Sequence, residues 1–245
     1  KSIEKICNLI NDYVNDLKEH ANGENIHTIE LPLINEDIGI FKMYFSYLWD
    51  ESGKIHSVIG KLVDISDEEK EKQLLIAKSQ SDGLTGLYNA STTKDSIEKL
   101  MAGKKAYSLD ALIVIDCDRF KDINDNYGHL KGDLALEYIS KGLKLTFRQS
   151  DIVGRVGGDE FCVYMQNIPT VDFVLMKCQQ LTRNINELSK QFLISISIGI
   201  ATYKEQITYE ELFKQADDAL YLAKKKGGSQ ISIAGESELI KIEFE

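Results

Sequence analysis

The stretch 151–168 reads DIVGRVGGDEFCVYMQNI, and it decides the expected fold. Residues 151–156 and 161–168 are β-prone and flank the pair Gly157-Gly158. Paired glycines favour a tight turn with positive φ, because glycine has no Cβ to collide with the backbone. The sequence therefore predicts a β-hairpin whose turn ends in two adjacent carboxylates, Asp159-Glu160.

Helices and strands alternate on both sides of this hairpin. The apolar run 111–116 predicts a buried strand, and apolar residues at helical spacing predict helices. We expect helices at 91–102, 131–147, 170–189 and 208–226, and further strands at 192–203 and 231–233. Thr208 and Glu211 have capping-box spacing at the start of the last helix, and Gly227 is placed to end it.

Three carboxylates stand at the expected strand ends: Asp116 is the last residue of the buried strand, and Asp159 and Glu160 lie just beyond the hairpin turn. Burying them without a cation would be costly, which favours a metal site. Mg²⁺ prefers hard oxygen ligands and keeps waters and substrate phosphates as its remaining ligands. Spacing alone leaves an alternative open, in which Asp159 and Glu160 are exposed turn residues and Asp116 caps the next helix.

Composition limits the function classes. The 245 residues are 43% hydrophobic, enough for a sizeable core, and we expect two domains. The formal charge of −10 argues against broad electrostatic binding to nucleic acid or anionic lipid. An anionic substrate would therefore need a local metal ion.

No apolar run approaches the roughly 20 residues of a membrane-spanning helix, and the chain, which begins at Lys1 and can be a fragment, shows no signal-peptide pattern. The cysteines lack CxxC spacing and are expected to be buried free thiols. They are Cys7, Cys117, Cys162 and Cys178. These features predict a cytoplasmic protein, or the cytoplasmic part of a larger receptor.

The motif Gly157-Gly158-Asp159-Glu160-Phe161 names the GGDEF family of diguanylate cyclases, and the surrounding blocks also resemble that family. These blocks follow the family's order from residue 82 to about residue 233. They are 82–89 (DGLTGLYN), 116–125 (DCDRFKDIND), Gly128-His129, Gly132-Asp133, 195–200 (SISIGI) and 216–224 (ADDALYLAK).

This resemblance implies an α+β, nucleotidyl-cyclase-like fold, related to the ferredoxin plan, with a central, mainly antiparallel sheet flanked by helices. It implies diguanylate cyclase activity, which condenses two GTP molecules into cyclic di-GMP and two pyrophosphates. Mg²⁺ or Mn²⁺ is the implied cofactor. Because one domain holds one GTP, a homodimer with two facing half-sites is implied as well.

The resemblance also assigns roles to single residues. The metal ligands are Asp116, the Cys117 carbonyl, Asp159 and Glu160; the guanine-reading residues are Asn124 and Asp133; the other nucleotide contacts are Phe120, Lys121, Gly158 and Lys224. A carboxylate can accept hydrogen bonds from guanine N1–H and its amino group, whereas adenine offers no such donor pair. Asp116, Asp159 and Glu160 form the catalytic set. Asp159 either helps to deprotonate the attacking 3′-hydroxyl or acts only as a ligand.

Arg148-Gln149-Ser150-Asp151 looks like the family's RxxD inhibitory site, at which the product binds. The planar guanidinium of Arg148 fits guanine O6 and N7, and Asp151 can take the opposite edge of the base. Arg155, on the same strand, is expected to assist. The alternative is an ordinary surface ion pair, worth under about 1 kcal/mol.

The N-terminal part has a different pattern. An amphipathic helix is expected at 1–22, and β-prone runs at 26–33, 38–49 and 54–65 suggest an antiparallel meander. The segment 49–66 resembles the last strands of a PAS sensor domain. We therefore expect residues 1–66 to be the C-terminal part of a PAS-like domain, with an unrelated small sheet as the alternative.

A linker helix over 67–81 is expected between this part and the GGDEF domain at 82–245. Ser66 and Glu69 have capping-box spacing at its start. In the family such a helix often pairs with its copy in a second chain. The apolar seam here is short, so a solvated helix is equally compatible.

The sequence departs from the family pattern at three places. Ala90 replaces an arginine of the opening segment, Cys117 replaces an aliphatic residue, and Gly228 replaces an arginine expected to contact phosphate. Losing that charged contact could cost about 1.5–3 kcal/mol. The main rival hypothesis is therefore a domain that binds GTP or cyclic di-GMP without catalysis. A protein that acts chiefly as a PAS sensor is a weaker rival, because half of that domain is missing.

Overall fold

The structure of the protein, a computed structural model, describes residues 26–32, 38–52, 55–103, 108–190, 193–203, 207–236 and 239–242. The chain divides into two compact units, residues 1–77 and 78–245, which are described separately. The helix expected at 1–22 lies outside the described residues. Among the described residues, no helix is long and apolar enough to cross a membrane.

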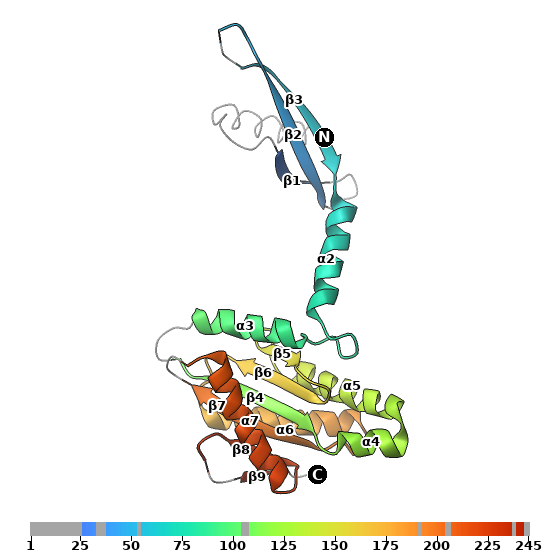
Figure 1. Ribbon diagram of the computed structural model, residues 1–245, viewed down its shortest axis with the longest axis vertical. Coiled ribbons are helices and arrows are strands. Elements are labelled where there is room, and N and C mark those ends of the chain that lie inside the picture. The colour runs from blue at the N-terminus through green and yellow to red at the C-terminus, as the bar shows by residue number, and fades with distance from the viewer. Residues whose placement is uncertain are drawn as a thin grey trace. The chain divides into compact units, whose positions relative to one another are not determined.

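The first unit contains the predicted antiparallel meander. Its strands are β1 (Ile26–Pro32), β2 (Ile38–Trp49) and β3 (Ile55–Asp64), which pair in that order (Figure 1). Both pairings are antiparallel, and the β2–β3 register shifts between Leu48 and Trp49. The strand predictions are thus confirmed, while the assignment to a PAS domain stays a prediction.

The linker helix α2 (Ser66–Gln80) begins where expected, but the expected capping box is wrong. The Ser66 hydroxyl donates to Asp64 Oδ1 at 2.6 Å and accepts a hydrogen bond from the Ile40 amide at 2.9 Å. Glu69 pairs with Lys72. Ser66 is thus held by the preceding strands, and its hydrogen bonds to Asp64 lower the pKa of that carboxyl.

The linker helix buries none of its side chains. Leu74, Leu75 and Ile76 are exposed, which fits either a solvated helix or a seam for a second copy. The pairing expected from the resemblance therefore stays a prediction.

The second unit is built on a six-stranded sheet with the order β5-β6-β4-β7-β8-β9. Its strands are β4 (Asp110–Cys117), β5 (Ile152–Arg155), β6 (Glu160–Met165), β7 (Ile196–Tyr203), β8 (Gln230–Ile233) and β9 (Leu239–Lys241). The β7–β8 pair is parallel, and the other neighbours are antiparallel. The mainly antiparallel sheet of the α+β prediction is confirmed. The edge strand β9 was not predicted.

Among the described residues of the second unit, five helices accompany this sheet. They are α3 (Ala90–Ala102), α4 (Phe120–Tyr127), α5 (His129–Thr146), α6 (Val171–Leu188) and α7 (Tyr209–Lys225). The predicted capping box of α7 is present, because Thr208 and Glu211 bond each other's backbone amides. The short helix α4 was not predicted, and α5 starts two residues earlier than expected.

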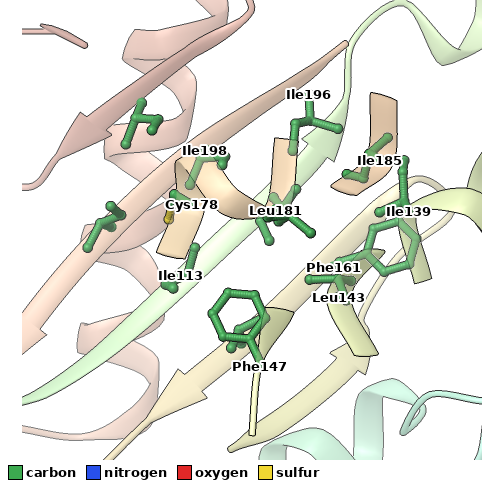
Figure 2. Close-up of a cluster of buried hydrophobic side chains, with 14 of the residues drawn as sticks. Ile113, Ile139, Leu143, Phe147, Phe161, Cys178, Leu181, Ile185, Ile196 and Ile198 are labelled. Carbon is green, nitrogen blue, oxygen red and sulfur yellow. The ribbon is translucent and has the colours of Figure 1, made fainter. Parts of the chain in front are cut away.

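The core lies on both faces of the sheet because β4 is buried along its whole length. Successive residues of a strand point to opposite faces. Ile113 and Ile115 join the cluster that includes residues of α5 and α6, which Figure 2 shows in part, whereas Leu112 and Val114 join the cluster with α3 and α7. Burial on both faces places β4 in the centre of the sheet, with Asp116 near its end.

Candidate active site

Strand pairing brings the predicted metal ligands together. Asp116 lies opposite Glu160, the first residue of β6, and opposite Ser197 on β7. The backbone amide of Cys117 donates to the carbonyl of Asp159 at 3.2 Å. Positions 44 residues apart in sequence therefore meet at one end of the central strands, because β4 and β6 pair in an antiparallel register that sets Asp116 opposite Glu160.

Asp116 is a buried carboxylate, with only 4% of its surface exposed. Lys224, in the last turn of α7, places Nζ 2.6 Å from Asp116 Oδ2. Burial raises the pKa of the Asp116 carboxyl to about 6, and the nearby carboxylates of Asp159 and Glu160 raise it as well, against the opposing effect of Lys224. A second cation would therefore be favourable here.

The donor chemistry of this end of the sheet fits a magnesium ion. Asp116, Asp159 and Glu160 supply hard carboxylate oxygens that interact electrostatically. Within the described part of the chain, no three His, Cys, Asp or Glu side chains are grouped closely enough to hold a metal by themselves. The Cys117 side chain belongs to the hydrophobic core and carries a soft sulfur, so this residue suits Mg²⁺ through its carbonyl oxygen. Substrate phosphates and waters would have to complete the coordination.

The signature turn differs from expectation in its backbone. The glycines with positive φ are Gly86, Gly128, Gly227, Gly228 and Gly235, so the positive φ predicted for the hairpin pair is wrong. The turn needs small residues for another reason. A Cβ on Gly157 would lie 2.6 Å from Glu160 Oε2, because the glutamate side chain folds over that glycine. No described atom lies within 4 Å of a Cβ added to Gly158, which leaves room for a nucleotide there.

The guanine-reading candidates lie on α4 and α5. A Cβ on Gly132 would lie only 2.0 Å from Asn124 Oδ1 and 3.3 Å from a ring carbon of Phe120. The glycine therefore lets the Asn124 side chain lie against α5, one residue before Asp133, which is exposed. Phe120 is partly buried and packs against the hydrophobic core, and its nucleotide contact stays a prediction.

The start of α4 is suited to phosphate. The N-cap residue Arg119 has φ 53°, and no side chain of the described residues caps the helix there. The first backbone N–H groups of a helix lack intrahelical partners and attract anions. Lys121, in this first turn, is exposed. The predicted phosphate residues thus gather at the end of β4 that carries Asp116.

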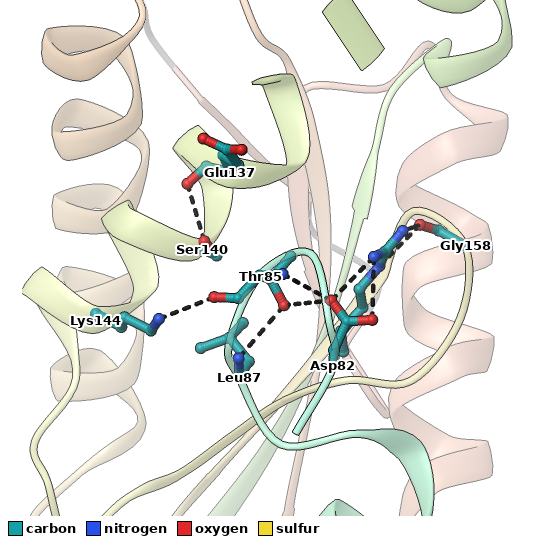
Figure 3. A network of polar contacts seen from close by, with 8 residues as sticks. Asp82, Thr85, Leu87, Glu137, Ser140, Lys144 and Gly158 are labelled. Atoms are coloured by element: carbon teal, nitrogen blue, oxygen red, sulfur yellow. Dashed lines mark hydrogen bonds and ion pairs between the residues drawn. The ribbon is translucent and has the colours of Figure 1, made fainter. Parts of the chain in front are cut away.

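Arg155 has partners that the sequence analysis missed. Its Nη1 bonds both carboxylate oxygens of Asp82 at 3.0 and 3.2 Å, and its Nε and Nη2 donate to the carbonyl of Gly158 at 3.1 and 2.6 Å. Figure 3 shows Asp82 and Thr85 near Gly158. Partial burial works against ionisation of Asp82, but hydrogen bonds from Thr85 and the Arg155 pair lower its pKa. Its guanidinium ties the opening segment to the signature turn, while its expected role at the inhibitory site stays a prediction.

At the predicted inhibitory site, Asp151 Oδ2 accepts a hydrogen bond from the backbone amide of Arg148 at 2.9 Å. The exposed Arg148 guanidinium lies over the ring of Phe173, 5.6 Å from its centroid. Burial raises the pKa of Asp151, and the Arg148 amide opposes this rise. Phe173 was missed, and only its position in the first turn of α6 could have suggested it.

Comparison with known proteins agrees with this geometry. Residues 79–230 match the family model described as the diguanylate cyclase, GGDEF domain. The chain is 36% identical over 171 residues to the probable diguanylate cyclase DgcC of Escherichia coli K12, covering 67% of this chain and 46% of the relative. It is 34% identical over 174 residues to diguanylate cyclase DgcM of the same organism, covering 70% and 42%. The chain thus spans less than half the length of these relatives.

Two solved structures share the fold of the second unit. The GGDEF domain of a Pseudomonas aeruginosa protein, TpbB or YfiN, matches with a TM-score of 0.58 and 32% identity, covering 63% of this chain and 94% of that one. The coiled coil and GGDEF domain of DgcB from Caulobacter crescentus, solved with c-di-GMP, matches with a TM-score of 0.64 at 23% identity, covering 69% and 93%. The second is a likeness of fold alone. Because the family model matches more than half of this chain, the chain belongs to the GGDEF, or diguanylate cyclase, family.

Proposed function

We propose that this chain condenses two molecules of GTP into cyclic di-GMP and releases two pyrophosphates. The observation that carries the proposal is the strand register that sets the buried Asp116 opposite Glu160 and joins Cys117 to Asp159. This cluster lies beside the uncapped start of α4, where a triphosphate can bind. The relatives named diguanylate cyclases agree with it.

The carboxylates of Asp116, Asp159 and Glu160, with the Cys117 carbonyl, would hold Mg²⁺ or Mn²⁺. The ion would neutralise charge on the phosphate that is attacked. Lys224 bonds Asp116 through a side chain that is 41% exposed, so its ammonium can turn toward a phosphate when GTP binds. Asp159 is proposed to take the proton of the attacking 3′-hydroxyl, and the 3′-hydroxyl of one GTP attacks the α-phosphate of the other.

A single domain offers one guanine pocket, so two copies must face each other for each nucleotide to meet its partner. Holding the reacting groups in line supplies much of the rate acceleration of such a reaction. We propose a homodimer of half-sites, with the first unit acting as a PAS-like sensor fragment and α2 as the linker. The exposed apolar residues of α2 support this arrangement.

The direct test is to incubate the purified chain with GTP and Mg²⁺ and to identify the nucleotide that forms. Cyclic di-GMP formation supports the proposal. Binding of GTP or cyclic di-GMP without any product would instead favour the non-enzymatic domain, for which the missing cation at Gly228 is the specific observation.

Base selection is expected to depend on Asp133. Its carboxylate pairs with guanine N1–H and repels adenine N1, so the parent should prefer GTP over ATP by more than about 100-fold. Asp133→Asn should reduce that preference, measured as incorporation from an equimolar mixture of the two nucleotides. Asp95→Asn, an exposed change on α3, is the matched control. Equal incorporation of both bases by the parent would contradict the assignment.

Product inhibition is expected to depend on Arg148. The exposed guanidinium, supported by the Phe173 ring, can bind a guanine edge of the product, whereas no catalytic group is lost when it is removed. Arg148→Ala should keep its initial rate and raise the inhibition constant for cyclic di-GMP at least about tenfold. Progress curves with added product measure this constant, and Arg183→Ala on α6 is the control. An unchanged constant would show that the inhibitory site is misassigned.

A further inference from the structure

The side chain of Asp118, the residue directly after β4, joins three segments of the second unit. Its Oδ2 accepts hydrogen bonds from Ser195 Oγ at 2.5 Å and from the Ser229 amide at 2.9 Å. Its Oδ1 accepts from Ser197 Oγ at 2.6 Å, and its own amide donates to the carbonyl of Ser195. The end of β4, the start of β7 and the loop after α7 therefore meet at one carboxylate.

The loop after α7 has a backbone that requires such an anchor. Gly227, Gly228 and Ser229 have φ values of 114°, 75° and 53°, which are three successive left-handed conformations. Ser229 carries a Cβ, and residues with a Cβ keep such a conformation only where the surroundings fix it. The hydrogen bond from its amide to Asp118 is a contact that fixes it here.

This loop also completes the end of α7. The amide of Gly228 donates to the carbonyl of Ala223 at 3.2 Å, and the amide of Gly227 donates to that of Lys224 at 3.1 Å. These two bonds form a Schellman motif. The last turn of α7, which carries Lys224, is thus tied through the loop to Asp118, and the Lys224 ammonium reaches Asp116 only two residues before it.

Asp118 also explains why position 228 is glycine. A Cβ there would lie 2.9 Å from Asp118 Oδ1 and 3.0 Å from its Cγ. The positive φ disfavours any side chain at the same position. A side chain at position 228 would therefore require the Asp118 carboxylate to shift and the backbone to strain, and Lys224 is the cation that the end of α7 places at Asp116.

We propose that Asp118 is a positioning residue of the substrate half-site, holding the end of α7 so that Lys224 is placed at Asp116 and the incoming triphosphate. This inference rests on the proposed function. In contrast to Asp116, Asp159 and Glu160, Asp118 is proposed neither to bind a metal ion nor to accept a proton. Its function requires hydrogen-bond geometry rather than charge.

Substitution of Asp118 by asparagine shows whether the residue is needed for its hydrogen-bond geometry or for its negative charge. An amide oxygen in place of Oδ2 can accept from Ser195 and Ser229, and the amide NH₂ in place of Oδ1 can donate to the Ser197 hydroxyl. Asp118→Asn therefore keeps the acceptor for Ser195 and Ser229, reverses the hydrogen bond with Ser197 and removes the charge, whereas Asp118→Ala loses all of these contacts.

The experiment measures kcat and KM for GTP in the full chain with Mg²⁺. Asp118→Ala should lower kcat/KM about 100-fold, chiefly through KM, because Lys224 is misplaced. Asp118→Asn should stay within about threefold of the parent, since its hydrogen bonds replace those of the carboxylate. An Asn variant as poor as the Ala variant would overturn the proposal, because the charge would then be needed. A fully active Ala variant would overturn it too.

A second variant guards against misfolding of Asp118→Ala. The double change Ser195→Ala with Ser197→Ala keeps the carboxylate but removes two of its donors, and it should lower kcat/KM at least about tenfold. Ser140→Ala, which removes a buried hydroxyl from α5, is the matched control. An active double variant would contradict the proposal. If the parent itself makes no cyclic di-GMP, the proposed function fails, and the affinities of the same variants for a fluorescent GTP analogue then test Asp118 by the same criteria.

Discussion

Glu160→Gln and Asp159→Asn are each expected to lower cyclic di-GMP synthesis by at least about 1,000-fold while leaving the fold intact. Each change removes one negative charge from the pair of carboxylates beside Asp116. The amide that replaces the carboxylate has nearly the same volume. The carboxylate of Glu160 already packs over Gly157, so the amide can occupy the same place. The loss should therefore appear in kcat, with little change in the unfolding midpoint.

The measurement is the initial rate of product formation with Mg²⁺, together with thermal unfolding of each variant. Glu137→Gln is the matched control, because Glu137 lies on α5 and pairs only weakly with Lys141 at 3.4 Å. Turnover at the parent rate by both site variants would refute the assignment of these carboxylates to the metal. A large drop in the unfolding midpoint would point to a structural role instead.

Much of this site could be predicted because its residues lie in elements with strong local signals. The continuous apolar run of β4 fixed a buried strand that ends near Asp116, and the β-prone flanks of the signature motif fixed the hairpin. Antiparallel pairing then brought Asp116 and Glu160 together. The capping box at Thr208 likewise fixed the start of the helix that carries Lys224.

Two of the features that were missed depend on contacts between distant segments, and the third depends on how a side chain folds within the signature turn. The ion pair of Arg155 with Asp82, 73 residues earlier, was not foreseen, because only its expected help at the RxxD motif was considered. Ser66 looked like a helix cap, but its hydroxyl bonds the strand residue Ile40. The paired glycines of the signature turn predicted positive φ angles. Gly157 is instead needed because a Cβ there would collide with the side chain of Glu160. In each case a local rule was overridden by a partner that only the fold supplies.

Asp116→Asn is expected to abolish activity and yet to stabilise the protein at neutral pH. Burial raises the pKa of the Asp116 carboxyl to about 6, above the ordinary value of 3.8. The folded state therefore binds the proton more tightly than the unfolded state, so the stability present below about pH 4 is lost as the pH rises toward 6. At pH 7.5 the ionised carboxylate costs about 1–3 kcal/mol of folding free energy, which the neutral amide avoids.

Urea unfolding of the parent and of Asp116→Asn measures this gain, in a chelating buffer so that no divalent ion compensates the charge. The variant should have the higher midpoint at pH 7.5, and the difference should shrink at pH 4.5, where the parent's folded carboxyl is largely protonated. Lys224 is exposed enough to be solvated once its partner is neutral, so it should not cancel the gain. Asp95→Asn, an exposed change on α3, is the matched control. A variant less stable than the parent at pH 7.5 would mean that the Lys224 ion pair outweighs the burial of Asp116, and the site would then hold its charges without needing a metal.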